Sequence, residues 1–291
     1  MNGVIVINKP AGMTSHDVVN RVRRILGEKS VGHLGTLDPM ATGVLPLVTG
    51  RLTRLAQFYT TSDKCYTGEI RFGFSTDTYD AEGEPTDEVS TVSVDSKIVH
   101  ELARKFLGRI QQVPPPFSAK KIQGVPAYKL ARKNKDVELK PVEVEIREFE
   151  ILRAQGDRAQ FRAEVSSGTY VRSLAHDLGQ KLGCGAHLSS LTRTRSGEFE
   201  IEDSVTLEEL QVSVEEGTAE QVFVHPRRLL PEFPSVTADE MSAARISHGQ
   251  AVNLPNTSAA KLVKVFASQT ELICIASRVA GTLFQPKVVF I

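Results

Sequence analysis

The chain has 291 residues, of which 41% are hydrophobic and 24% are charged. These proportions are typical of a soluble globular protein, and they exclude collagen-like, disulfide-scaffold and wholly disordered chains. The 35 basic residues balance the 35 acidic residues, so the formal net charge is zero and a nucleic-acid partner must be bound by local basic patches. This length predicts about two domains.

Several kinds of segment and site are missing from the sequence. No apolar run approaches the roughly 18 residues of a membrane span and no signal peptide is evident, so we expect a cytoplasmic protein without a membrane partner. The cysteines Cys65, Cys184 and Cys274 lie far apart, which favours reduced thiols over a disulfide framework. Metal-binding motifs, a complete Walker A motif and a GxGxxG after a strand are all absent. We therefore expect neither a metal nor a nucleotide cofactor.

The N-terminal elements follow clear periodicities. Residues 4–8 predict a short strand, and Thr14 or Ser15 is expected to cap a helix whose apolar side chains recur with a 3.6-residue period until Gly27. Residues 31–43 are dense in Gly, Thr, Asp and Pro, a composition that predicts an ordered loop.

The middle of the chain alternates between strands and charged segments. Residues 66–72 have the period-2 pattern of a strand with one buried face, and an acidic loop follows at 77–88. A helix is expected at about 97–107. Residues 120–140 then contain seven Lys or Arg against two acidic residues, which is a local positive excess.

Further strands are expected at 142–149 and 159–165, and a helix after Gly168 carries Arg172 in its first turn, off the apolar stripe. The proline-bounded stretch 231–234 indicates a boundary, and the last sixty residues read as a small all-β module. Neighbouring strands without intervening helices predict an α+β fold, with a mixed, largely antiparallel sheet flanked by helices.

The most informative segment is residues 32–45, with the sequence GHLGTLDPMATGVL. Its glycines permit backbone conformations closed to other residues, and Pro39 restricts the chain beside a single carboxylate, that of Asp38. Taken alone, an Asp-Pro in a glycine-rich loop is more often a turn than a catalytic site. The whole string predicts a rigid loop that presents Asp38.

This string resembles the catalytic motif of the TruB branch of the pseudouridine synthases. Residues 8–15 (NKPAGMTS) resemble the N-terminal motif of that family, and residues 64–68 (KCYTG) resemble its tyrosine-bearing strand. Residues 167–174 (SGTYVRSL) resemble the motif that supplies an arginine, and residues 191–197 (LTRTRSG) resemble a final hydrophobic element. These motifs cover most of residues 1–200 in the expected order.

The resemblance implies an RNA isomerase that acts on the T-loop uridine at tRNA position 55. Such an enzyme cleaves the bond between N1 and C1′, turns the base and rejoins it through C5, without a cofactor. Asp38 would attack as a nucleophile or take the C2′ proton, and the two routes stay open. Tyr66 would stack on the base and handle the C5 proton, and Arg172 would pair with Asp38. By pattern alone, Tyr66 is a core aromatic and Arg172 a solvated residue.

The resemblance also implies residues that bind the substrate. Lys9 would support the tyrosine's strand and the pocket wall, Leu191 would close the apolar side of the pocket, and His33 would fill the space left by the extruded uridine. The basic segment at about 115–140 resembles a thumb insertion that binds RNA. Its expected contacts are Lys120, Lys121 and Tyr128.

The implied organisation is a catalytic domain at 1–231 followed by a β domain at 232–291, where this branch often carries a PUA-like RNA-binding domain. A different small β module stays open for that region. The family implies a monomer. Two alternative functions remain at this point: an RNA-binding or RNA-folding protein without turnover, and a guide-RNA-dependent pseudouridine synthase.

Overall fold

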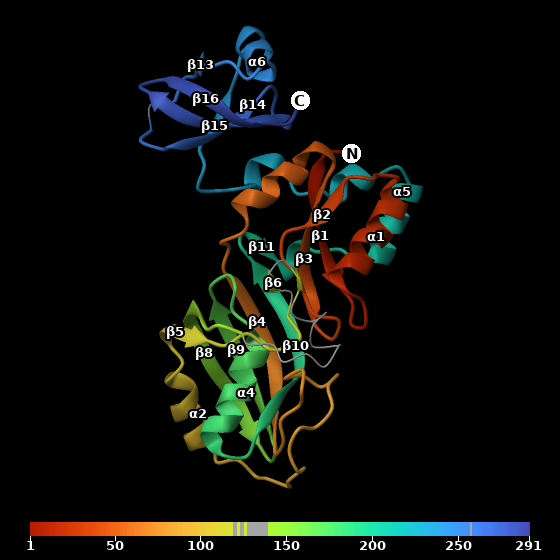
Figure 1. Ribbon diagram of the computed structural model, residues 1–291. Coiled ribbons are helices and arrows are strands. Elements are labelled where there is room, and N and C mark those ends of the chain that lie inside the picture. Colours follow the sequence, from red (N-terminus) through yellow and green to blue (C-terminus); the bar gives the residue numbers. More distant parts are fainter. Residues whose placement is uncertain (119–120, 123–124, 127–138, 257) are drawn as a thin grey trace.

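The computed structural model describes residues 1–118, 121–122, 125–126, 139–256 and 258–291. It is an α+β protein with one large mixed sheet, a smaller sheet at the C-terminus and helices packed on both (Figure 1). In the part of the chain that the structure describes, no helix is long and apolar enough to cross a membrane.

The large sheet has the strand order β1-β3-β10-β4-β9-β8-β5, with β2 paired to β3 and β11 paired to β10. Every pairing in it is antiparallel except that of β10 with β3, which confirms the expected mixed, largely antiparallel sheet. Its strands are β1 (Gly3–Lys9), β2 (Val31–His33), β3 (Thr42–Thr49), β4 (Lys64–Phe72), β5 (Gly108–Gln112), β8 (Val142–Gln155), β9 (Arg158–Val165), β10 (Ala186–Ser196) and β11 (Phe199–Glu200).

The helices cover the large sheet in two groups (Figure 1): α1 packs with α5 near β1 and β2, and α2 and α4 lie against β8 and β10. The α-helices are α1 (Ser15–Leu26), α2 (Ser96–Arg104), α4 (Val171–Leu182), α5 (Leu207–Glu215) and α6 (Glu240–Ser247). The 3₁₀ helices are η1 (Gly50–Phe58), η2 (Ile201–Asp203), η3 (Ala219–Val222) and η4 (Pro226–Arg228).

The start of α1 shows how the local sequence fixes an element. The Thr14 hydroxyl accepts a hydrogen bond from the Asp17 amide at 3.0 Å, and the Asp17 carboxylate accepts one from the Thr14 amide at 2.9 Å. This capping box begins the helix. Gly27 ends it with a φ of +62°, a conformation that favours glycine, so both predicted helix ends are confirmed.

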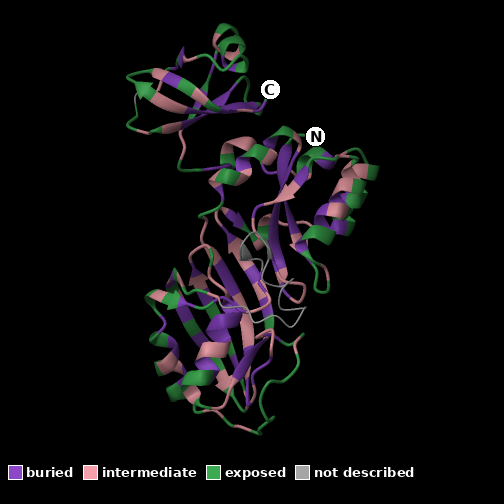
Figure 2. Ribbon diagram, in the orientation of Figure 1, coloured by how far each residue is buried: buried purple, intermediate pink, exposed green. Residues whose placement is uncertain are grey.

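Strand β1 is buried on both faces, which explains its unbroken apolar sequence. Ile5 and Ile7 belong to the core beneath the helices, whereas Val4 and Val6 belong to a second apolar cluster on the opposite face. That second cluster also contains side chains from η1 and from the C-terminal sheet. Buried residues lie on the strands of both sheets (Figure 2), and this second cluster joins the C-terminal sheet to the large sheet through η1.

The C-terminal sheet has the order β12-β14-β15-β16-β13. Its strands are β12 (Ser235–Thr237), β13 (Val252–Asn253), β14 (Leu262–Phe266), β15 (Leu272–Ala280) and β16 (Leu283–Val289). The buried ammonium of Lys264 donates to the carbonyl oxygens of Arg227 and Leu229 at 2.9 and 2.6 Å, which ties this sheet to the segment that leads into it.

Three expectations about secondary structure need correction. Residues 31–33 form β2, because backbone pairing with β3 supplies the hydrogen bonds that a loop composition would not predict. The strand expected at 142–149 continues to Gln155 along β9. The C-terminal module is not all β, since α6 begins at an Asp239 cap and buries Ile246 against its sheet. The segment 115–140 also contains a short hairpin of β6 (Lys121–Ile122) and β7 (Val125–Pro126).

Candidate active site

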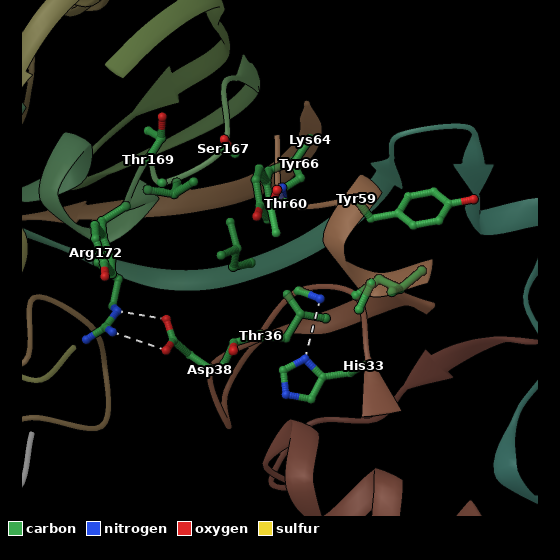
Figure 3. Close-up of a pocket in the computed structure, with 18 residues that line it drawn as sticks. His33, Thr36, Asp38, Tyr59, Thr60, Lys64, Tyr66, Ser167, Thr169 and Arg172 are labelled. Carbon is green, nitrogen blue, oxygen red and sulfur yellow. Dashed lines mark hydrogen bonds and ion pairs between the residues drawn. The ribbon is translucent and has the colours of Figure 1, made fainter. Parts of the chain in front are cut away.

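Two hollows meet at Asp38. One, drawn in Figure 3, has a volume of about 450 Å³ and is lined by the loop before β3, by β4, by β10 and by the segment that enters α4. The other has a volume of about 690 Å³, and its lining includes Thr78 and Phe117. Asp38 and Arg172 line both, so these two side chains stand at the junction of the two spaces.

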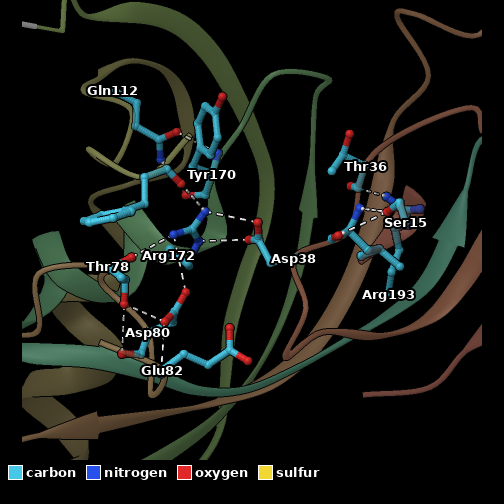
Figure 4. Close-up of polar contacts among 12 residues, drawn as sticks. Ser15, Thr36, Asp38, Thr78, Asp80, Glu82, Gln112, Tyr170, Arg172 and Arg193 are labelled. Carbon is cyan, nitrogen blue, oxygen red and sulfur yellow. Dashed lines mark hydrogen bonds and ion pairs between the residues drawn. The ribbon is translucent and has the colours of Figure 1, made fainter. Parts of the chain in front are cut away.

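The predicted pair of Asp38 and Arg172 is formed (Figure 4). Arg172 Nε lies 2.9 Å from Asp38 Oδ2, and Nη2 donates to Oδ1 at 3.1 Å. A planar guanidinium that meets both carboxylate oxygens fixes the orientation of the carboxylate as well as its charge. The Arg172 side chain is only 5% exposed, so it is not the solvated residue that its position off the apolar stripe indicates.

A second carboxylate, which the sequence analysis did not single out, also pairs with Arg172. Asp80 Oδ2 lies 3.3 Å from Arg172 Nη1, and both side chains are 5% exposed. The same Nη1 donates to the carbonyl of Thr78 at 2.8 Å, and Nη2 donates to that of Phe117 at 3.0 Å. The acidic loop at 77–88 thus supplies part of the site, and its composition alone gave no signal of that.

The loop that carries Asp38 is fastened on both sides of the carboxylate. The Ser15 hydroxyl accepts from the Leu37 amide at 2.8 Å and donates to the Leu37 carbonyl at 3.1 Å. On the other side, the Lys9 ammonium donates to the carbonyl of Pro39 at 3.1 Å. The glycine-rich segment is therefore held in one conformation, as the sequence predicts.

Lys9 binds main-chain carbonyl oxygens near Asp38. It is fully buried, and its ammonium donates to the carbonyls of Pro10, Met13 and Pro39. None of these acceptors lies on β4, so the Lys9 ammonium holds the loop of Asp38, and support of the Tyr66 strand by this lysine stays a prediction. Burial lowers the pKa of Lys9 to about 8, an effect that the nearby Asp38 carboxylate opposes.

Arg193 of β10 is a third buried cation at the site, and the sequence analysis did not identify it. Its Nε donates to the carbonyl of Val44 at 2.7 Å, and its Nη1 and Nη2 donate to those of Thr36 and Gly35 at 3.2 and 3.1 Å. Gly43 faces it with a φ of +96°, and a Cβ there would lie 2.2 Å from the Arg193 carbonyl oxygen. The pairing of β3 with β10 therefore requires glycine at this position.

Tyr66 and Leu191 line the same hollow as Asp38 (Figure 3), from the paired strands β4 and β10. Both side chains are 7% exposed. Burial raises the pKa of the Tyr66 phenol, while the Arg193 guanidinium opposes that rise. The phenol therefore keeps its proton at neutral pH, and its ring forms part of an apolar wall.

His33 lies at the end of β2 and lines both hollows. Its Nδ1 accepts a hydrogen bond from the Gly35 amide at 3.4 Å. Burial lowers its pKa, and so does the Arg193 guanidinium, so the imidazole is neutral at pH 7. A neutral ring at this junction can occupy space beside a base without adding charge.

The remaining predicted contacts belong to the basic segment. Lys120 and Tyr128 lie outside the described residues, and Lys121 is described only as part of β6. Lys64 was not predicted, yet it lines the hollow beside Tyr66, and burial lowers the pKa of its ammonium to about 8. Among the described residues, no group of three His, Cys, Asp or Glu side chains could hold a metal ion.

Family models assign the class of enzyme. Residues 23–171 match the model for the N-terminal domain of the TruB family pseudouridylate synthases, and these residues include Asp38 and Tyr66. Residues 172–231, which begin with Arg172, match the model for the tRNA pseudouridylate synthase B C-terminal domain. The fold and the site are therefore those of a pseudouridine synthase.

Individual relatives agree with this class. The chain is 51% identical to "tRNA pseudouridine synthase B" of Solibacter usitatus (strain Ellin6076), over 99% of this chain and 100% of that protein. It is 41% identical to the protein of the same name from Bacillus cereus (strain ATCC 10987 / NRS 248), over 94% of this chain and 92% of that one. The chain belongs to the TruB family of pseudouridylate synthases.

A solved structure supports the fold across the whole chain. A chain in the structure of an H/ACA RNP bound to a substrate RNA containing 2′-deoxyuridine aligns with a TM-score of 0.74 at 25% identity. The alignment covers 99% of this chain and 85% of that one, so it includes the C-terminal sheet. The expected pseudouridine synthase fold is confirmed.

Proposed function

We propose that this pseudouridine synthase converts the T-loop uridine at tRNA position 55 into pseudouridine. The observation that carries the proposal is the close ion pair of Asp38 and Arg172 at the edge of a hollow whose wall includes Tyr66 and Leu191. Relatives that match nearly the whole chain are named for tRNA, which supports tRNA as the substrate class.

The site fits an isomerisation that needs no oxidant or energy source. The bond between N1 and C1′ breaks, a bond between C5 and C1′ forms, the C5 proton leaves and N1 gains a proton, so the product is an isomer of the substrate. Asp38 would begin the reaction, either as a nucleophile at C1′ or C6 or as the base for the C2′ proton. Arg172 would keep this carboxylate aimed at the sugar, and Tyr66 would support the detached base.

The uridine must leave the RNA stack to reach Asp38, and extrusion costs a few kcal/mol that new contacts must offset. In the proposal, the neutral ring of His33 fills the vacated place in the RNA. Lys9 acts indirectly by bracing the loop of Asp38. The segment of Lys120, Lys121 and Tyr128 binds RNA beyond the pocket.

The proposed organisation has a catalytic domain at 1–231 and a PUA-like RNA-binding domain at 232–291. The separate five-stranded sheet supports this division. In this proposal the enzyme works as a cytoplasmic monomer without a cofactor. The apolar cluster that includes residues of both sheets supports a fixed arrangement of the two domains.

Tritium release tests the function. An unmodified tRNA transcript labelled at uridine C5 is incubated with the protein, without cofactor, metal or guide RNA. We expect release of about one equivalent per tRNA, because one C5 proton is lost at each modified uridine. A transcript with cytidine at position 55 is the control and should release no label. Binding without release would favour a guide-dependent enzyme or an RNA-binding protein instead.

Tyr66→Phe separates two roles of the tyrosine. Phenylalanine keeps the ring in the apolar wall but lacks the hydroxyl, so we expect tRNA affinity within about twofold of wild type and a single-turnover rate lower by at least about 10²-fold. Filter binding and tritium release measure the two quantities. A rate close to that of wild type would limit Tyr66 to stacking.

The basic segment should contribute mainly electrostatic affinity. Replacing Lys120, Lys121 and Lys129 by Gln should weaken tRNA binding and reduce the slope of log Kd against log salt by about one unit for each lost phosphate contact. Because phosphate contacts contribute to affinity and not to the chemistry at Asp38, the rate at saturating tRNA should change little. An unchanged salt slope would contradict the proposed phosphate contacts.

A further inference from the structure

The loop that pairs with Arg172 contains an unusual backbone conformation. Tyr79 has a φ of +64°, in the region that favours glycine. The residues on either side of it, Thr78 and Asp80, supply the two acceptors for Arg172 Nη1, a carbonyl oxygen at 2.8 Å and a carboxylate oxygen at 3.3 Å. The left-handed turn at Tyr79 therefore brings a main-chain and a side-chain acceptor from neighbouring residues to one nitrogen.

The ring of Tyr79 packs on the helix that carries Arg172. It stacks on the imidazole of His176, with ring centroids 3.8 Å apart and planes 9° apart. His176 follows Arg172 by four residues in α4, so the two side chains lie about one turn apart on the same side of the helix. Within the described structure, His176 Nδ1 is buried without a hydrogen-bond partner, which leaves the stack as the ring's specific contact.

The main chain of the loop is held on its other side by β10. The Leu188 amide donates to the Tyr79 carbonyl at 3.0 Å, and the Ala81 amide donates to the Leu188 carbonyl at 3.0 Å. These bonds fix the position of the loop along β10. Towards α4 the loop is held by the contacts of Arg172 with Thr78 and Asp80, and the stack of Tyr79 on His176 adds a contact one helical turn further along.

We propose that the stack of Tyr79 on His176 is a positioning device that sets Asp80 against Arg172 and, through Arg172, the orientation of Asp38. This inference rests on the proposed function, because it assigns Tyr79 and His176 as positioning residues for the same reaction. A glycine would adopt the backbone conformation of Tyr79 with less strain. The proposed role of the ring accounts for a tyrosine in a conformation that favours glycine.

Tyr79→Gly tests the device, since glycine accepts the positive φ and removes the side chain that carries the ring. We expect a single-turnover rate about tenfold below that of wild type, with tRNA affinity within about twofold. Tyr79→Phe keeps the ring and should restore the rate to within about twofold of wild type. Phe106→Leu removes a ring that packs edge-on against Phe149, and it controls for a general loss of stability.

A double-mutant cycle shows whether the effect passes through Asp80. In an Asp80→Asn background, Tyr79→Gly should change the rate by less than about twofold, because the group that it positions has already lost its charge. A full tenfold effect in that background would overturn the inference. A Tyr79→Gly rate equal to that of wild type, or a Phe106→Leu rate as low as that of Tyr79→Gly, would also overturn it.

One measurement is independent of catalysis. The Arg172 Nε–H resonance in a ¹⁵N NMR spectrum should move in Tyr79→Gly and stay in place in Tyr79→Phe, and an unmoved resonance in Tyr79→Gly would overturn the inference. If wild-type protein releases no tritium from tRNA while this resonance behaves as expected, the proposed substrate is wrong and the positioning role stands.

Discussion

Asp38→Asn should lower the rate of pseudouridine formation by at least about 10⁴-fold and leave tRNA affinity within about threefold of wild type. An amide has nearly the size of the carboxylate, so the loop fastened by Ser15 and Lys9 should keep its shape. An amide is a poor nucleophile and a poor base, so either route from Asp38 is blocked. Tritium release and filter binding measure the two effects.

Asp157→Asn is the matched control for Asp38→Asn. Asp157 also forms an ion pair with an arginine, Arg71 Nε at 3.1 Å, but both side chains are well exposed at the surface. An exposed pair contributes little, so this variant should be as active as wild type. Turnover by Asp38→Asn above about 1% of wild type would refute the assignment of Asp38.

Arg172→Met should reduce both stability and rate. Methionine removes all the donors that meet Asp38, Asp80, Thr78 and Phe117. Because Asp80 is buried, its carboxylate would lose its charged partner and keep only the hydrogen bonds from the Thr78 hydroxyl and the Glu82 amide, so we expect a loss of about 3 kcal/mol of unfolding free energy, at the lower end for a broken buried pair. The Asp38 side chain is 35% exposed, so water can solvate much of its carboxylate charge when the guanidinium is removed. We expect a rate lower by about 10³-fold.

Two further variants make the Arg172 experiment specific. Arg172→Lys keeps a positive charge without the planar fork, so it should recover part of the stability but little of the rate. Asp80→Asn combined with Arg172→Met should be more stable than Arg172→Met alone, because the unpaired buried charge is gone. Denaturant unfolding measures both. Wild-type stability in Arg172→Met would show that the ion pairs do not support the fold.

The sequence predicts well what local patterns determine. The cap at Thr14, the strand around Tyr66 and the first-turn position of Arg172 all depend on residues within about ten positions, and the structure confirms them. The motif around Asp38 is also local. The resemblance then brings Asp38, Tyr66 and Arg172 to one site, where the structure places them.

The sequence predicts poorly what depends on distant partners. Asp80 lies in a loop of many acidic residues, and only the fold shows that its carboxylate is the one beside Arg172. Arg193 stands in an alternating polar stretch, yet it is buried because three carbonyls from another segment meet its guanidinium. The sequence does not show that the Lys9 ammonium binds three carbonyls, because only the fold brings those of Pro10, Met13 and Pro39 together around it.

The long sequence separations within the site bear on its assembly during synthesis. Asp38 meets its arginine 134 residues later, and Thr36 meets Arg193 157 residues later. At about 5 to 20 residues per second, a ribosome needs about 7 to 27 seconds to add the 134 residues between Asp38 and its arginine. For that interval the nascent chain carries the carboxylate without the guanidinium that orients it. The enzyme therefore acquires its activity only after two thirds of the polypeptide has been made.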